Sequence, residues 1–165
     1  MQDISSQLVD QIQAARVSRS PLKIMGNGSK EHFCGRDIEG EVLSLREHRG
    51  IINYDPNELV LTARAGTTLA ELNTLLNDNG QMFSFEPPHF GAGATLGGTL
   101  ACNLSGPARP WGGSIRDMLL GVRLITAKGD KLRFGGQVMK NVAGYDVARL
   151  QAGALGCLGV IAEVS

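Results

Sequence analysis

A glycine-rich stretch at residues 90–111, with Arg109 as its one charged residue, limits most strongly how this chain folds. Between Glu86 and Arg109 lie 22 consecutive residues without a charge, yet their side chains are too small and too polar to span a membrane. Its glycines are Gly91, Gly93, Gly97, Gly98 and Gly106. Because glycine has no Cβ, backbone N–H groups here can lie directly against a flat or anionic ligand. The same glycines would equally serve tight turns beneath a crowded sheet, so the stretch alone leaves both interpretations open.

Composition excludes several classes of protein. The chain has 165 residues, enough for one domain or two small lobes that share a core. Lys plus Arg balance Asp plus Glu at 16 each, so no net charge attracts nucleic acid or an anionic membrane. The N-terminus lacks the basic start and apolar run of a signal peptide. Three widely spaced cysteines without a C-x-x-C pair argue against a disulfide framework and predict a cytoplasmic protein.

A second glycine loop stands near the N-terminus, at Gly26-Asn27-Gly28-Ser29-Lys30. It follows a predicted strand at residues 22–25 and has the composition of a phosphate-binding loop. Glu31 stands where the dinucleotide fingerprint has its third glycine, and no helix is predicted after it, which disfavours a Rossmann site. The P-loop pattern is absent. Any ligand here is expected to be held by a loop between strands.

Hydrophobic periodicity predicts two helices and several strands. Residues 3–16 have the pattern of an amphipathic helix. Thr68-x-x-Glu71 is a capping box for a second helix, which ends at Asn79-Gly80. The predicted strands are residues 22–25, 41–45, 50–54, 59–65, 81–85, 118–126, 132–134 and 159–164.

The remaining segments complete the expected α+β arrangement. Thr95 is expected to cap a short helix that has Leu96 and Leu100 on its apolar face. We expect an exposed turn at residues 46–49 and a short helix at residues 149–158. The last strand ends without a cap or polar tail, which suggests a piece of a longer protein.

No constellation for hydrolytic or covalent catalysis is visible, and no catalytic base can be named. His32, His48 and His89 stand in three separate loops without a neighbouring carboxylate cluster, so no metal site is predicted. Cys102 has no base near it in sequence and is interpreted as a small buried thiol. What remains is two glycine loops plus a third glycine-punctuated segment at residues 153–159. Together they favour a large ligand with a pyrophosphate and a flat ring.

Four motifs in order carry a family resemblance: ATLGG, RPWGGSIRD, FGG-x-VMKNVAGYD and GCLGVI. With the GNGSK loop, they resemble the FAD-binding (PCMH-type) domain of the vanillyl-alcohol oxidase class, over nearly the whole chain from Leu22. The resemblance implies a two-lobed α+β fold with FAD between the lobes. Lobe 1 is expected at about residues 1–80, with β-α-β elements, and lobe 2 at about residues 81–165, with an antiparallel sheet. Such enzymes carry a C-terminal substrate domain, which the resemblance leads us to expect is absent from this chain.

The resemblance also implies which residues contact the cofactor. The first loop corresponds to the segment that wraps the FAD pyrophosphate: Gly26, Asn27, Gly28 and Ser29. The second continues the pyrophosphate and flavin contacts: Thr95, Gly97, Gly98 and Asn103. The closing segment contacts FAD from the other lobe: Gly156, Val160 and Ile161.

Two departures from the family pattern refine these expectations. Relatives with covalently bound flavin often carry a histidine after the first glycine pair, where this chain has Ser29, so non-covalent FAD is predicted. Many relatives have Gly-Ser-Glu-Gly where this chain has Gly153-Ala154-Leu155-Gly156, which removes a polar contact at Leu155.

The resemblance implies the cofactor-holding part of a flavin-dependent 2-hydroxy-acid dehydrogenase. The expected substrate in the full enzyme is a small 2-hydroxy acid, with glycolate favoured, and the expected partners are other subunits of a glycolate-oxidising enzyme. Any attachment to the inner membrane would be made through those partners. D-lactate, an aldonolactone or a cytokinin are alternative substrates. A different class of function is a docking subunit that has lost its flavin; it predicts a folded chain that binds no FAD.

Overall fold

Two β-sheets with helices around them make up the chain, and the computed structural model describes residues 2–34, 39–136 and 144–165. The strands are β1 (Leu22–Met25), β2 (Glu41–Ser44), β3 (Ile51–Asp55), β4 (Val60–Arg64), β5 (Gly121–Ile125), β6 (Lys131–Gly135) and β7 (Val160–Val164). The helices are α1 (Ser5–Ser18), the 3-10 helix η1 (Glu31–Cys34), α2 (Leu69–Asp78), α3 (Leu96–Cys102), α4 (Arg109–Gly112), α5 (Ile115–Met118) and α6 (Val147–Leu150). Most of the KNVAGYD motif lies outside the described residues.

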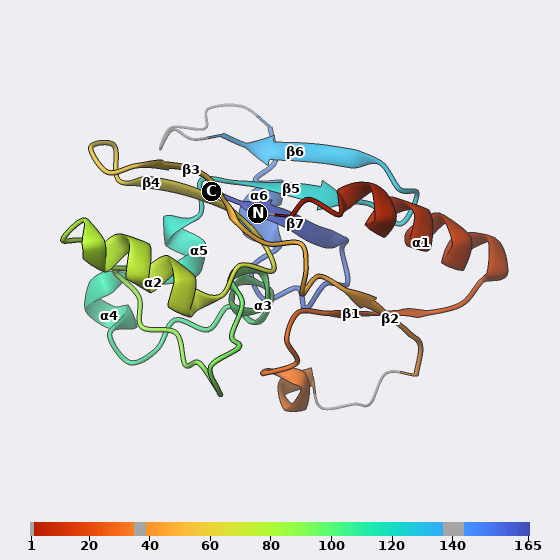
Figure 1. Ribbon diagram of the computed structural model, residues 1–165, viewed down its shortest axis with the longest axis horizontal. Helices are drawn as coiled ribbons and strands as arrows, with labels where there is room; N and C mark the ends of the chain where they lie inside the picture. Colours follow the sequence, from red (N-terminus) through yellow and green to blue (C-terminus); the bar gives the residue numbers. More distant parts are fainter. Residues whose placement is uncertain (1, 35–38, 137–143) are drawn as a thin grey trace.

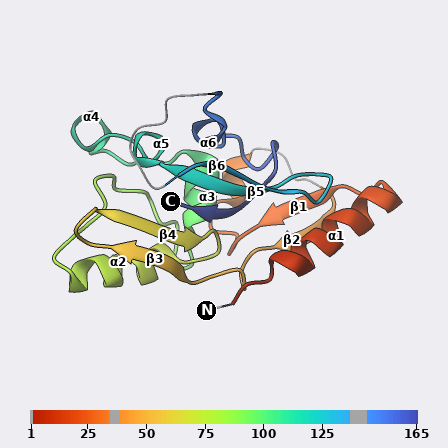
Figure 2. The same ribbon diagram turned by 90° about the horizontal axis from the view of Figure 1, so that it is seen from above.

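The two sheets differ in strand direction. β1 and β2 pair in parallel, with Leu22 opposite Glu41 and Met25 opposite Ser44. The other strands form one antiparallel sheet in the order β3-β4-β7-β5-β6. This sheet joins strands from both sides of residue 80, where the lobe boundary is expected. Both views place α2 and α4 toward one end of the molecule and α1 with the β1–β2 pair toward the other (Figures 1 and 2).

The helices begin where the sequence supplies a cap. Thr68 forms the predicted capping box with Glu71, and Gly80 follows the end of α2 with a φ of 66°. Thr95 caps α3, because its Oγ1 accepts a hydrogen bond from the Gly98 N–H at 3.2 Å. No described helix is long and apolar enough to cross a membrane.

A single apolar core joins the helices to the antiparallel sheet. α1 contributes Leu8 and Ile12, α2 contributes Leu72, and α3 contributes Leu100. The sheet supplies buried side chains from β4, β5 and β7. The α+β fold class is therefore confirmed, and α3 is held in the middle of the molecule, where one of its faces can line a site.

Several sequence predictions about individual elements are wrong. Residues 81–85 form no strand, so the β-α-β unit lacks its last member. The strand expected at residues 118–126 is shorter, because a Ser114–Asp117 capping box starts α5 and takes Met118 into that helix. The helix expected at residues 149–158 is the four-residue α6, which ends at Leu150.

His48 is the largest correction among the side chains. The sequence places it in an exposed turn, yet its exposed fraction is 0%. Its Nδ1 accepts a hydrogen bond from the Ile4 N–H at 3.2 Å, which ties the N-terminal segment to the loop after β2. Burial lowers the pKa of His48, in keeping with a neutral ring that accepts this bond.

Candidate functional site

The two glycine loops predicted from the sequence lie against each other. Asn27 Nδ2 donates a hydrogen bond to the Gly93 carbonyl at 2.9 Å. A Cβ on Gly26 would lie 2.7 Å from Thr95 Oγ1, and one on Gly93 would lie 3.1 Å from Asn27 Cβ. Real Cβ contacts are almost never as short as the one at Gly26, and the one at Gly93 is tighter than most, so glycine at both positions permits the close approach of the loops.

Backbone donors are concentrated in these loops without protein acceptors. Across residues 2–34, 39–136 and 144–165, no N–H group of residues 26–30 or 89–95 donates a hydrogen bond to a protein acceptor. Ala94 and Thr95 are themselves buried residues. Buried backbone N–H groups require an acceptor, so the unpaired donors at Ala94 and Thr95 suit a ligand that carries oxygen atoms.

At the start of α3, unlike in the two loops beside it, the backbone N–H groups have acceptors within the protein. Its first N–H groups are used inside the protein: Leu96 donates to Thr67 O at 2.9 Å, Gly97 to Ala65 O at 2.8 Å, and Gly98 to Thr95 Oγ1 at 3.2 Å. A Cβ on Gly97 would lie 2.6 Å from the Ala65 Cβ, so this glycine permits close packing of α3. The free donors expected at Gly97 and Gly98 are therefore not available; Gly97 serves close packing, and Gly98 leaves space at the pocket wall instead.

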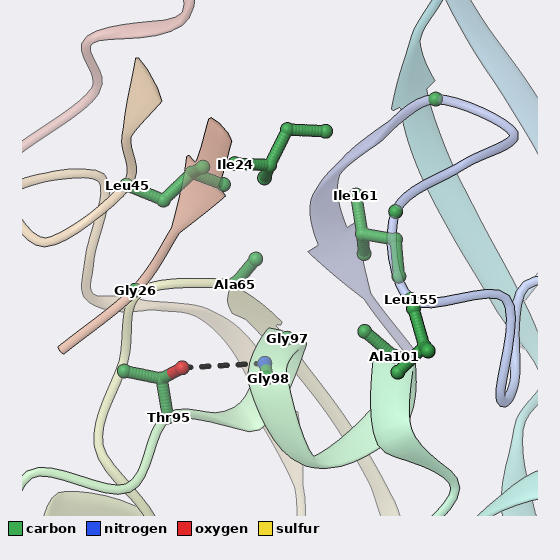
Figure 3. A pocket seen from close by; sticks show the side chains of 12 residues that line it. Ile24, Gly26, Leu45, Ala65, Thr95, Gly97, Gly98, Ala101, Leu155 and Ile161 are labelled. Atoms are coloured by element: carbon green, nitrogen blue, oxygen red, sulfur yellow. Dashed lines mark hydrogen bonds between the residues drawn. The ribbon is translucent and has the colours of Figure 1, made fainter. Parts of the chain in front are cut away.

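A pocket opens between the first loop, α3 and the segment before β7 (Figure 3). Its walls are glycines, aliphatic side chains and one threonine: Ile24, Gly26, Leu45, Ala65, Thr95, Gly97, Gly98, Ala101, Leu155, Gly156, Gly159 and Ile161. None of these residues carries a charge. The pocket therefore offers an apolar wall next to a loop of free backbone donors.

A second pocket of about 380 Å³ adjoins the first and shares Ile24, Gly156 and Gly159 with it. It extends toward α1, where Arg16 and Arg19 contribute to its walls. Ligand pockets commonly measure about 300–1,000 Å³. The second pocket falls in this range, whereas the first measures about 80 Å³, so only the two together offer room for an elongated ligand.

Most residues predicted to contact a cofactor gather at the first pocket. Those that line it are Gly26, Thr95, Gly97, Gly98, Gly156 and Ile161. Asn27, Gly28 and Ser29 belong to the adjoining loop, and Val160 lines the second pocket. Asn103 ends α3 with a φ of 51°, and its buried Oδ1 has no hydrogen-bond partner within the described part of the chain.

Sequence reasoning missed the aliphatic wall of the pocket. Ile24, Leu45, Ala65 and Ala101 belong to four different segments of the chain. Only Ile24 gave a signal, because it stands in a strand immediately before a glycine loop. Leu155, the position of the departure from the family pattern, also faces the pocket and adds an apolar side chain there (Figure 3).

Charged groups near the first loop are few. Lys23 pairs with Glu31, and Arg46 Nε donates to Asn27 Oδ1 at 2.8 Å. Lys30 is only 6% exposed, and burial lowers its pKa. No group of three His, Cys, Asp or Glu residues in the described ranges is placed to hold a metal ion.

Among the side chains that the structure describes, the histidines and cysteines give no catalytic arrangement. His32 lies edge-on to Phe90, with ring centroids 5.2 Å apart, and so adds an aromatic contact between the two loops. Cys102 is partly exposed rather than buried as expected. The site has the properties of a binding site: free donors, an apolar wall and no nucleophile among the residues that line the first pocket.

Comparison with known proteins places this geometry in context. The family described as "FAD binding domain" matches residues 5–135. Glycolate oxidase subunit GlcE of Escherichia coli is 55% identical over 163 residues, which is 99% of this chain and 46% of that protein. Glycolate oxidase subunit GlcD of Bacillus subtilis is 30% identical over 149 residues, 88% of this chain and 32% of that protein. This chain thus spans about half the length of the first relative and a third of the second.

Solved structures agree on the fold. Alkyldihydroxyacetonephosphate synthase superposes with a TM-score of 0.75 and 26% sequence identity, over 96% of this chain and 31% of that one. Another relative in sequence, the mitochondrial D-lactate dehydrogenase [cytochrome] of Arabidopsis thaliana, is 36% identical over 95 residues, 58% of this chain and 16% of that protein.

Proposed function

This chain belongs to the FAD binding domain family, and we propose that it is the FAD-binding part of a flavin-dependent 2-hydroxy-acid dehydrogenase. The observation that carries the proposal is the meeting of two loops, residues 26–30 and 89–95, whose backbone N–H groups have no acceptor in the described protein. The oxygen atoms of a diphosphate are acceptors of the required kind.

The residues present fit FAD in two further ways. The pocket beside the loops is walled by Ile24, Leu45 and Leu155, which suit the faces of a flat flavin ring. Gly98 and Gly156 leave room for a ring to lie close to the backbone. When bound, FAD supplies the hydride-accepting chemistry, while these residues bind it, orient it and exclude water from its face.

Non-covalent binding of FAD is part of the proposal. Ser29 occupies the loop position where a histidine would be expected for a covalent link. No histidine, cysteine or tyrosine lines the first pocket. The side chains nearest the proposed ring position therefore offer no nucleophile for attachment.

The proposed substrate is glycolate, oxidised to glyoxylate at its CH–OH carbon. Support comes from the two relatives named as glycolate oxidase subunits, which also support the proposal of other subunits as partners. A cytoplasmic location is part of the same proposal. D-lactate is the second candidate, because a D-lactate dehydrogenase is also among the relatives. The docking alternative receives no support from the loops, since a chain that no longer bound FAD would have no need to keep these donors free.

Titration of the purified, flavin-stripped chain with FAD tests the proposal, followed by flavin fluorescence and absorbance. We expect saturable binding, and acid precipitation should release all the flavin into solution. Colour that stays with the precipitated protein would refute non-covalent binding. A folded chain that binds no FAD would favour the docking alternative, and the same titration of a version extended to the length of the relatives would confirm or reject it. Flavin reduction by glycolate against D-lactate in that longer protein tests the substrate.

A further inference from the structure

Lys30 is a buried cation without a carboxylate partner. Its exposed fraction is 6%, and its Nζ makes one hydrogen bond within the described residues, to Ser29 Oγ at 3.4 Å. No described Asp or Glu forms an ion pair with it. Removing an ammonium group from water is costly unless a charge or several acceptors compensate, and burial accordingly lowers the pKa of Lys30.

Other cations near the first loop are engaged with protein groups. Lys23 pairs with Glu31, and Arg46 is hydrogen-bonded to Asn27. Both contacts hold the loop in shape and use the donors involved. Lys30 differs because its one hydrogen bond, to a hydroxyl at 3.4 Å, is long.

Lys30 is also a residue of the first loop, whose Gly26 lines the first pocket. The hydrogen bond to Ser29 Oγ at 3.4 Å keeps the ammonium group against this loop. The ammonium group therefore lies with the free N–H groups of residues 26–30.

A diphosphate needs more than hydrogen bonds at this site. The free N–H groups of residues 26–30 and 89–95 supply donors but no net charge, and none of the residues lining the first pocket is charged. We propose that the Lys30 ammonium group is the counter-ion of the ligand's diphosphate, and that it makes the site selective for dinucleotide flavin over flavin without phosphate. This inference rests on the proposed FAD-binding function and adds one side chain to it.

The test compares three probes on Lys30→Met: FAD, ADP, which has the diphosphate without the flavin, and riboflavin, which has the flavin without phosphate. We expect the affinities for FAD and ADP to fall about ten- to hundredfold, as for a lost charge-assisted hydrogen bond, with riboflavin binding unchanged. Lys30→Arg should retain most of the affinity, and Lys128→Met, which removes an exposed cation in another turn, should change nothing.

Equal loss for all three probes would mean a purely structural role and would overturn the inference, as would unchanged binding of FAD and ADP. If the parent chain binds no FAD, the proposed function fails instead. A second measurement does not depend on the variant folding: amine acylation of the parent chain, read by mass spectrometry. ADP should protect Lys30 and leave Lys128 reactive; equal labelling of Lys30 with and without ADP would also reject the proposal.

Discussion

Two loops leave the same end of the parallel β1–β2 pair, and they use their backbone groups in opposite ways. In the loop after β2, residues 45–50, Leu45 N–H donates to Met25 O at 2.8 Å and Gly50 N–H donates to Thr67 Oγ1 at 2.9 Å. In the loop after β1, residues 26–30, no N–H group has an acceptor in the described protein. We call them the closed loop and the open loop, respectively.

The closed loop is part of the core, whereas the open loop is part of the candidate site. His48 in the closed loop is fully buried, and its carbonyl accepts a hydrogen bond from Gly66 at 2.9 Å. Position at a strand end therefore does not distinguish a structural loop from a binding loop. The two loops differ in their backbone donors: those of the closed loop are mostly paired within the protein, as buried backbone groups ordinarily are, whereas those of the open loop are left for a ligand or solvent.

A substitution that disrupts the packing of the closed loop should have the largest effect, and that effect should be a loss of stability. A Cβ on Gly66 would lie 2.0 Å from Leu45 O and 2.7 Å from His48 O, both backbone atoms that cannot turn aside. We expect Gly66→Ala to lower the free energy of unfolding by about 3 kcal/mol or more, as an extreme case of overpacking. Denaturant unfolding measures this loss; a variant as stable as the parent would contradict the close packing of this loop.

Breaking the open loop should affect ligand binding instead. Gly28 has a φ of +74°, and Gly80, far from the site, has a φ of +66°. Valine at either position should cost about 1–2 kcal/mol of stability, because both adopt the left-handed conformation. Only Gly28→Val should weaken FAD binding, by about a hundredfold, since its side chain would occupy the approach of the phosphate.

Gly80→Val is the matched control for this prediction. Equal FAD affinities in the two variants, measured by fluorescence titration and corrected for the folded fraction, would remove the open loop from the site.

A smaller change at the pocket wall should separate binding from stability more cleanly. A Cβ on Gly98 would meet only Thr95 Oγ1, at 3.1 Å. Alanine in a helix is about 1 kcal/mol more favourable than glycine, so Gly98→Ala should keep or raise the unfolding free energy. The added methyl group enters the pocket and should lower FAD affinity about tenfold. Thermal unfolding and FAD titration of the same sample check both expectations, and unchanged affinity would place the ring elsewhere.

The smallest expected effect concerns the contacts that hold the N-terminus near the closed loop. The pKa of Asp3 is lowered from 3.8 to about 2, chiefly because its carboxylate accepts a hydrogen bond from the Ser5 N–H. The nearby positive charge of Arg64 lowers it further. A carboxyl with a lowered folded-state pKa contributes stability above pH 3.8 that is lost as the pH falls toward 2. Because Asp3 is about half exposed, we expect Asp3→Asn to cost less than about 1 kcal/mol at pH 6.

This difference between the parent chain and Asp3→Asn should shrink as the pH falls toward 2 and be lost below pH 2, in denaturant unfolding measured across pH. A difference that persisted there would mean that the Asp3 contacts do not depend on its charge.

Local signals in the sequence predicted much of the fold. The capping residues Thr68 and Thr95 and the turn at Gly80 were placed correctly, because caps and left-handed glycines depend on a few adjacent residues. The family resemblance is confirmed by the match over residues 5–135. The strand expected at residues 81–85 was wrong, because a short apolar run does not specify a hydrogen-bonding partner.

The burial of His48 and the aliphatic wall of the pocket could not be predicted from the local sequence. A histidine between charged residues has the pattern of a solvated turn, and only the packing of the N-terminal segment against that turn buries it. Ile24 and Ala101 line one pocket although 77 residues separate them in the chain. The sequence around Ile24 does not indicate that Ala101 lies near it, and the sequence around Ala101 does not indicate Ile24.

By itself the sequence determined where this chain has glycine loops and which family it resembles, because residue type and order carry both signals. Only the tertiary structure decided that residues 26–30 meet residues 89–95, and which donors stay free there. Every residue except proline has the same backbone N–H group, whatever its side chain. Whether that group finds an acceptor depends on which distant segment packs against it, as Gly97 beside Ala65 and Gly28 in the open loop demonstrate.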